Sequence, residues 1–444
     1  AQGVVTGKKA GKTVVTAKNK KKTYKCTVTV KAGKPTPEPE DSDEPVSSVQ
    51  FSLPVTRENA SLSSLLPKVL MRGCEDFPSM KDINRRLDDL YAAEVYGRVY
   101  SRGETQFFGI AADMLRNNLC PDGTDVTGGV FSLIHSLIFR PCTENGAFRT
   151  DYTESEKKQL RAAIESGKNN KRRYAIKRCE EEMCKDEPYG IPTYGYPEDI
   201  DGITPEALYA FYRNTLTKTR CEIYFVGKTD EDELIHKVKK LFGHLGRDAC
   251  SAFECKVVRQ AGKVKEITES FPMEQSKLSL GFRTGTVLSD GTWHIFSVFS
   301  EIFGGSATSK LFMNVREKLS LCYYCSCVSE AHKGIMVVYS GINACNRDKA
   351  QTEILAQLDA VKKGEISEDE LESAKLCVIN SYRAISDSPS TMEGWCTGRR
   401  LAGISTMPEE CIELVRTVTA EDVVNIAKKI TLDTVYFMEA EKND

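Results

Sequence analysis

The chain has 444 residues, of which 40% are hydrophobic and 28% are charged, so it is long enough for two or three domains with cores of their own. The formal net charge of −2 creates no general attraction to nucleic acid or to anionic membranes, and we expect no nucleic-acid partner. No run approaches the roughly 18 continuous apolar residues of a membrane span, and the first residues lack the apolar core of a signal peptide. The composition therefore favours a cytoplasmic globular protein without a membrane span.

Residues 1–32 form a compositional zone of their own. The run VVTGKKAGKTVVTAKNKKKTYKCTVTV alternates Val and Thr between Lys and Gly turns, which predicts three short strands. It resembles the closing half of a bacterial group-2 immunoglobulin-like repeat, which would instead imply a cell-surface or secreted location. Residues 33–45 are rich in Pro and acidic residues and predict an extended, solvated linker. The composition becomes globular from Val46.

A single strand-like run, FSLPV at Phe51, precedes the first long helical run at Ser61. A strand without a neighbour would leave backbone hydrogen-bonding groups unpaired. We therefore expect that the N-terminal fragment replaces missing first strands, in a truncated or fused gene product. In the alternative, the Val/Thr strands of residues 1–32 pair with this run.

The helical run SLSSLLPKVLMRG, from Ser61 to Gly73, ends in apolar residues, a basic residue and glycine. It resembles the helix that carries the inverted His-x-x-Glu-His zinc motif of the insulinase, pitrilysin and mitochondrial processing peptidase family, known as inverzincins. This resemblance places Ser64 and Lys68 at the two histidine positions and Pro67 at the glutamate position. A hydroxyl is a poor zinc ligand, a protonated ammonium has no free lone pair, and proline has no carboxylate to accept a proton from water. The catalytic positions are therefore degenerate.

The resemblance also implies a third ligand, a glutamate on a later helix. The corresponding run EKKQLRAAI begins at Glu156 and places Ala163 at the ligand position, with Glu165 nearby. No two of the five histidines have the three- or four-residue spacing that places both on one helical face; they are His135, His236, His244, His294 and His332. We expect no metal, no cofactor and no peptidase activity from the chain alone.

The globular part contains an internal duplication. The run GITPEALYAFYRNTLTKTRCEIYFVG, from Gly202, predicts a capped helix followed by a strand, and TVTAEDVVNIAKKITLDTVYFMEA, from Thr417, repeats that order. The alternating run TQFFGIAADML likewise matches GIMVVYSGINA. We predict an α+β fold of two homologous domains, residues 46–250 and 264–444, each an antiparallel-rich sheet covered by helices.

The run FGGSATSKLFMNVREKLSLCYYCS, from Phe303 to Ser326, is similar to a segment of the second domain of the same family. In active relatives an Arg and a Tyr of this segment reach the substrate carbonyl, and the resemblance places them at Arg316 and Tyr323. Both residues could instead be retained for packing. Gly304 and Gly305 either border a peptide groove or form a tight turn beside a helix.

The 16 cysteines are scattered along the chain, which favours reduced, buried side chains over a disulfide framework. The densest group lies in LCYYCSCVS. Strict strand alternation would place Cys325 and Cys327 on one face and Cys322 on the other. The short basic run KNNKRR, from Lys168 to Arg173, has no interleaved aromatic residue and predicts a solvated helix end.

The phrases RRLDDLYAAEV, YAIKRCEEEMCKDEPYG and ITPEALYAFY resemble a bacterial branch of the family that lacks the zinc motif. The resemblance implies a catalytically inactive homologue or subunit that binds a peptide, for example at a sheet edge, and pairs with an active His-x-x-Glu-His paralogue or with a second copy of itself. Two alternatives remain: a surface or scaffolding protein with a vestigial peptidase fold, and a peptidase with an unrecognised metal site. The sequence leaves open which peptide is handled and whether the partner is obligate.

Overall fold

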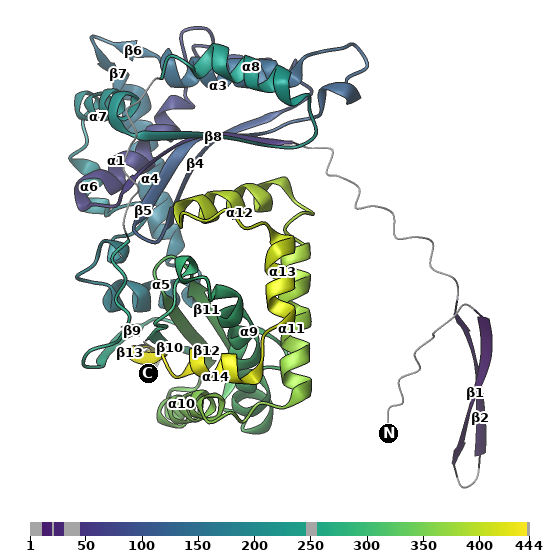
Figure 1. Cartoon of the computed structure of the whole chain (residues 1–444). Coiled ribbons are helices and arrows are strands. Elements are labelled where there is room, and N and C mark those ends of the chain that lie inside the picture. The colour runs from purple at the N-terminus through teal and green to yellow at the C-terminus, as the bar shows by residue number, and fades with distance from the viewer. Residues whose placement is uncertain (1–10, 20–21, 31–44, 246–254, 442–444) are drawn as a thin grey trace. The chain divides into compact units, whose positions relative to one another are not determined.

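The computed structural model describes residues 11–19, 22–30, 45–245 and 255–441 and divides the chain into two compact units, Ala1–Asp43 and Glu44–Asp444 (Figure 1). In the first unit, β1 (Gly11–Asn19) and β2 (Lys22–Val30) form an antiparallel hairpin in which Gly11 faces Val30. Two of the three predicted strands are thus present, and residues 1–10 lie outside the described ranges. So does the predicted linker, apart from Pro45.

The second unit begins with a four-stranded antiparallel sheet in the order β4-β5-β3-β8. Its strands are β3 (Val46–Pro54), β4 (Glu94–Arg102), β5 (Thr105–Asp113) and β8 (Arg220–Val226). Strand β3 is buried on both faces because Val49 and Phe51 enter the hydrophobic core while Ser48 and Gln50 point to the other side. The alternation of the sequence therefore determines which side chains enter the core.

The expectation that the strand at Phe51 lacks neighbours is wrong. Val49 of β3 lies opposite Ile110 of β5 on one side and Ile223 of β8 on the other. Both neighbours come from later in the chain, so β3 needs no preceding strand and leaves no free edge for β1 or β2. The edges of this sheet are β4 and β8.

Helices cover one face of the first sheet and enclose a core of apolar side chains. The helices of this part of the chain are α1 (Arg57–Leu70), α2 (Met80–Asp88), η1 (Asn117–Leu119), α3 (Val126–Phe139), α4 (Thr150–Gly167), α5 (Lys171–Met183), η2 (Pro188–Gly190), α6 (Pro197–Asp201), α7 (Pro205–Lys218) and α8 (Glu231–Phe242), with a small hairpin of β6 (Thr143–Glu144) and β7 (Ala147–Phe148). The predicted capped helix is confirmed, because Thr204 accepts a hydrogen bond from the amide of Ala207 at the start of α7.

A five-stranded sheet in the order β11-β12-β10-β13-β9 follows. Its strands are β9 (Lys265–Phe271), β10 (Ser276–Arg283), β11 (Cys322–Glu330), β12 (Ile335–Ile342) and β13 (Thr431–Ala440). The first four strands of this order repeat the connectivity of the first sheet, and β9 adds a parallel edge strand beside β13. The predicted α+β fold with antiparallel-rich sheets and a duplicated plan is confirmed. The predicted domain limits stay a prediction.

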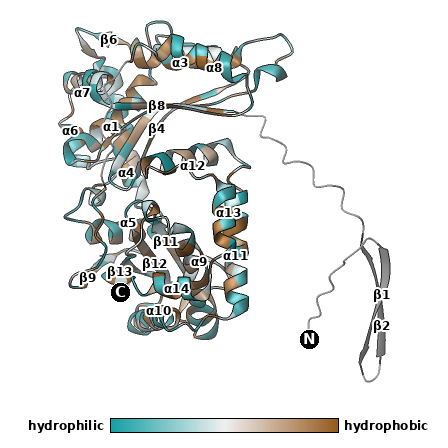
Figure 2. Ribbon diagram, in the orientation of Figure 1, coloured by the Kyte–Doolittle hydropathy of each residue, from teal (hydrophilic) through white to brown (hydrophobic). Residues whose placement is uncertain are grey.

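The helices of this part again pack on one face of their sheet. They are η3 (Leu288–Asp290), α9 (Trp293–Ser300), η4 (Glu301–Gly305), η5 (Leu311–Lys318), η6 (Ala344–Asn346), α10 (Arg347–Lys362), α11 (Glu368–Arg383), α12 (Pro389–Leu401), α13 (Pro408–Arg416) and α14 (Ala420–Ala427). In Figure 2 the helices carry hydrophilic and hydrophobic residues side by side, as expected for helices with one face on a core.

Two helices are exchanged between the sheets. Helix α12 lies against the first sheet at β3 and β8, and α5 lies against the second sheet at β10, β12 and β13 (Figure 1). Gly281 of β10 permits the close approach of α5, since a Cβ at this position would lie 2.9 Å from the Sδ of Met183. Each sheet is therefore covered on its second face by a helix from the other part of the chain.

The predicted placement of Cys322 is wrong. The pairing of β11 with β12 shifts register between Cys322 and Tyr324, which leaves Tyr323 in a β-bulge. The extra residue shifts the alternation of side chains between the two faces by one position. Cys322, Cys325 and Cys327 therefore all lie on the same face and are buried in the helix-covered core. The bulge turns Tyr323 outward, and its exposed fraction is 61%.

Candidate functional site

The candidate site begins on α1, which packs against β4, β5 and α4. Thr56 caps its N-terminus by accepting a hydrogen bond from the amide of Asn59, whose side chain accepts one from the amide of Thr56. This capping box starts the helix at Arg57 and places positions 64 and 68 one turn apart on one face.

Ser64 is fully buried in a neutral hydrogen-bonded network. Its hydroxyl donates to the carbonyl oxygen of Thr193 at 2.8 Å, and the side-chain amide of Gln106 donates to the same carbonyl at 2.7 Å. The Gln106 amide also lies 3.3 Å from the Ser64 hydroxyl and 3.1 Å from the carbonyl of Ala60. The loop at Thr193 therefore closes over the position where the family places its first histidine.

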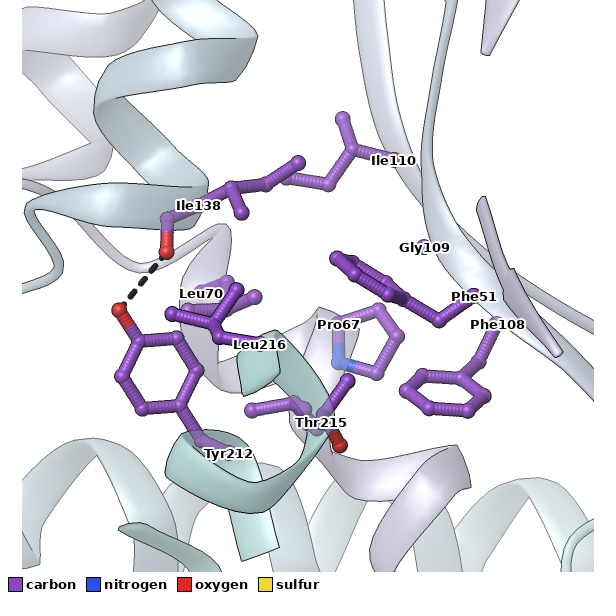
Figure 3. Close-up of a pocket in the computed structure, with 11 residues that line it drawn as sticks. Phe51, Pro67, Leu70, Phe108, Gly109, Ile110, Ile138, Tyr212, Thr215 and Leu216 are labelled. Atoms are coloured by element: carbon purple, nitrogen blue, oxygen red, sulfur yellow. Dashed lines mark hydrogen bonds between the residues drawn. The ribbon is translucent and has the colours of Figure 1, made fainter. Parts of the chain in front are cut away.

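Pro67 lies among apolar side chains (Figure 3). Phe51, Phe108 and Leu216 line the same small cavity, and no described Asp or Glu is among its lining residues. The backbone of Pro67 is also in close contact with β4, because a Cβ at Gly97 would lie 3.1 Å from the Pro67 carbonyl carbon. The place that the resemblance assigns to the catalytic glutamate is thus filled by hydrophobic packing.

The two remaining predicted positions offer no ligand set. Lys68 is half-buried on α1, and Ala163 is half-buried on α4, which lies beside α1. Glu165 forms an ion pair at 3.0 Å with Lys168, the residue directly after α4, rather than with a residue of α1. Among residues 45–245 and 255–441, no group of three or more His, Cys, Asp and Glu side chains has the geometry of a metal site. These residues do not fit zinc, and no chemical step through a metal follows from them.

Arg316 and Tyr323 are both accessible. Arg316, near the end of η5, has a side chain that is 40% exposed, and its guanidinium lies 4.6 Å from the ring centroid of Phe312. Its charge also reaches Cys322: a hydrogen bond from Cys325 lowers the pKa of the Cys322 thiol, and Arg316 acts in the same direction. Tyr323 is the residue after Cys322 and lies in the bulge of β11. Both residues lie at one edge of the second sheet, although no contact joins their side chains in the described part of the chain.

Gly304 and Gly305 have different surroundings. Gly304 is buried, and a Cβ there would lie 2.7 Å from the Cδ1 of Leu311 and 3.3 Å from the amide nitrogen of Cys327. Its carbonyl accepts a hydrogen bond from Ser326 at 2.8 Å. Gly305 is exposed, and its nearest neighbour is the flexible carboxylate of Glu301. Gly304 therefore fits η4 tightly against β11, whereas Gly305 is accessible to solvent.

The structure contains a buried ion network at the junction of the two sheets, which the sequence analysis did not predict. Lys333, in the β11–β12 turn, is fully buried and lies 2.6 Å from Glu104 and 2.6 Å from Glu187. Arg283 joins the network at Glu187, 2.6 Å away, and at Asp433, 2.9 Å away. No local pattern reveals this cluster, because its members are up to 329 residues apart and come from five different segments.

Burial and partners oppose each other in this network. Burial alone would lower the pKa of Lys333, but hydrogen bonds to Glu104 and Glu187 raise it above its ordinary value. Burial alone would raise the pKa of Glu187, whereas hydrogen bonds from Arg283 and Lys333 hold it below its ordinary value. The network is therefore charged, and it links residues 45–245, which form the first sheet, to residues 255–441, which form the second.

Helix α12 is fixed to the first sheet by a second set of polar contacts that the sequence did not reveal. Glu393, 1% exposed, accepts hydrogen bonds from the hydroxyl of Ser48 at 2.7 Å and from the guanidinium of Arg98 at 2.8 Å. Thr397, one turn later, accepts a hydrogen bond from Gln50 at 3.4 Å. The polar alternate residues of β3 thus have partners from the other part of the chain.

Comparison with known proteins shows which proteins this chain resembles in sequence and in fold. The family profile described as "Peptidase M16 inactive domain" matches residues 202–376. The "Probable inactive metalloprotease YmfF" of Bacillus subtilis is 31% identical over 386 residues, covering 87% of this chain and 90% of that protein. The crystal structure of a conserved protein from Enterococcus faecalis V583 superimposes with a TM-score of 0.82 at 27% identity and covers 91% of this chain and 96% of that one.

A peptidase M16 inactive domain from Pseudomonas fluorescens has the same fold, with a TM-score of 0.71 at 17% identity over 89% of this chain and 94% of that one. Fold and site together define an inactive homologue of a metalloprotease. The chain belongs to the peptidase M16 family. Within the described ranges, none of its helices has the length and apolar character needed to cross a bilayer.

Proposed function

We propose that this chain is the non-catalytic subunit of a zinc metallopeptidase, which binds an extended peptide and pairs with an active partner that carries His-x-x-Glu-His. The exposure of Tyr323 carries the proposal. A tyrosine retained for packing would be buried, since burying its ring stabilises the fold. Here a bulge turns the ring outward at the edge of a sheet, where Arg316 also is accessible.

Loss of the metal positions alone would leave a vestigial fold without a function. The contrast between the two regions favours a retained binding function, because Ser64 and Pro67 are enclosed by the chain itself, whereas Arg316 and Tyr323 are available to another molecule. A guanidinium and a phenol can both donate hydrogen bonds to a carbonyl or an oxyanion that forms at a partner's metal. Strand β4 provides an open sheet edge beside α1 for an extended peptide.

The test is co-expression of the full chain with a His-x-x-Glu-His paralogue from the same source. We expect an equimolar complex that cleaves an internally quenched peptide and loses activity with a chelator. Arg316→Ala and Tyr323→Phe should each reduce kcat/KM, by roughly tenfold to a hundredfold if they contact the reacting carbonyl, and leave the complex intact. Arg383→Ala, a change of the same type at an exposed arginine of α11, should have no effect.

Two results would refute parts of the proposal. Absence of a complex at micromolar concentrations of both chains would refute the pairing. A complex whose activity is unchanged in Arg316→Ala and Tyr323→Phe would refute the role of these two residues across the interface.

A further inference from the structure

The basic run from Lys168 to Arg173 does not end in solvent alone. It leads into α5, which lies against the second sheet. The ammonium of Lys171 lies 4.2 Å from the ring centroid of Phe271, and the guanidinium carbon of Arg172 lies 5.7 Å from Tyr324 and 5.9 Å from Tyr339. The aromatic residues that the run lacks in sequence are therefore supplied by β9, β11 and β12.

Lys277 of β10 brings a second cation to the same ring. Tyr324, Gly341 and Lys277 are direct neighbours across β11, β12 and β10. A Cβ at Gly341 would lie 2.6 Å from the Cε1 of Tyr324, so the ring leans over the glycine toward β10. The Lys277 ammonium lies 5.7 Å from the Tyr324 centroid, the same distance as the guanidinium of Arg172. Two cations thus share one tyrosine.

In the part of the chain that the structure describes, no acidic side chain neutralises this pair of cations. Among the described residues, neither Arg172 nor Lys277 forms an ion pair, and Lys277 donates to the neutral amide oxygen of Gln275 at 2.6 Å. Burial lowers the pKa of Lys277, and the charge of Arg172 lowers it further. Arg178, farther along α5, differs because it pairs with Glu181, Glu182 and Glu269. The face of the sheet near Tyr324 is therefore a local concentration of positive charge.

We propose that Arg172 and Lys277, with the rings of Tyr324 and Tyr339 beneath them, form a site for a carboxylate of a bound peptide. The inference rests on the peptide binding proposed above and adds a preference for acidic segments. A guanidinium binds the planar carboxylate through two parallel hydrogen bonds, and an anion between two like charges relieves their repulsion. Tyr324 lies on β11, an edge strand of the sheet, so a peptide can reach the site from outside.

The test uses the full chain, immobilised, and random decapeptide libraries read by mass spectrometry. One library has amidated C-termini, so that carboxylates come only from Asp and Glu, which are compared with the isosteric Asn and Gln. A second library has free C-termini. Comparison of the two libraries separates a side-chain carboxylate from a terminal one.

We expect peptides with a carboxylate to be retained roughly fivefold to tenfold over their neutral counterparts, the range for a partly screened charged hydrogen bond. Arg172→Gln and Lys277→Met should abolish this preference. Arg173→Gln is the matched control, since it removes the same charge from an exposed neighbour on α5 and should leave the preference intact.

Equal retention of acidic and neutral peptides by the unaltered chain, or a preference that survives Arg172→Gln, would overturn the carboxylate site and leave peptide binding standing. Failure to retain any peptide would refute the proposed peptide binding and this site with it. Retention of oligothymidylate that depends on Arg172, without a preference among peptides, would assign the cation pair to nucleic acid and overturn the proposal.

Discussion

Replacement of Lys333 by methionine tests the buried ion network at the junction of the two sheets. The ammonium is fully buried and lies 2.6 Å from both Glu104 and Glu187. After Lys333→Met, Glu187 keeps Arg283 as a partner, whereas Glu104 keeps, among the described residues, only the amide of Lys256, which donates to it at 2.9 Å. One buried carboxylate therefore loses its compensating charge.

Removing one partner of a buried ion pair costs about 3–5 kcal/mol, and the remaining hydrogen bond to Glu104 places our expectation near the lower end, at about 3 kcal/mol of unfolding free energy. Urea unfolding followed by tryptophan fluorescence measures it, because the two tryptophans, Trp293 on α9 and Trp395 on α12, both pack against the core of the second sheet. Lys428→Met, at an exposed lysine, is the control and should change the midpoint little.

A second variant tests the reason for the loss. Adding Glu104→Gln to Lys333→Met removes the uncompensated charge and should recover at least about 1 kcal/mol, a coupling typical of residues in direct contact. The reasoning is refuted if Lys333→Met lowers stability by less than about 1 kcal/mol, or if the double variant is no more stable than the single one.

Four further predictions concern the pH dependence of stability, the packing of glycine and the binding of metal. The folded-state pKa of Glu187 is held below its ordinary value of 4.5, so its contribution to stability is present above pH 4.5 and is lost as the pH falls through the folded value. Glu187→Gln should therefore weaken the fall of the urea midpoint at acidic pH, when the midpoint is measured as a function of pH. Burial raises the pKa of Glu180 to about 6, so the folded state binds the extra proton and stability falls as the pH rises from 4.5 through 6; Glu180→Gln should remove that slope, and an unchanged slope would contradict it. Gly304→Ala should cost about 1–3 kcal/mol in urea unfolding because its Cβ would overlap Leu311, whereas Gly305→Ala should stay within about 0.5 kcal/mol, and equal effects would contradict the packing argument. EDTA should leave the urea midpoint unchanged. The variant Ser64→His/Lys68→His should not bind one zinc per chain tightly when its metal content is measured by elemental analysis, because Ala163 supplies no third ligand and the Thr193 loop covers position 64.

Local sequence determined the elements and their repetition. The Thr204 cap, the strands β5 and β12 and the helix-strand pairs at Gly202 and Thr417 depend on neighbours within a few residues, so they are readable from the chain alone. The same holds for the loss of ligand chemistry at Ser64, Pro67 and Lys68, because side-chain type decides whether a lone pair or a carboxylate is present.

Tertiary structure decided the features that depend on distant segments. Strand β3 has two neighbours because β8, more than 160 residues later, pairs with it, and Cys322 enters the core because one residue of β11 bulges from its pairing with β12. The basic run at Lys168 meets tyrosines only because α5 crosses to the second sheet. Strand pairing, the β-bulge and the exchange of helices depend on the free energy of packing between segments remote in sequence. A local sequence pattern does not contain this information.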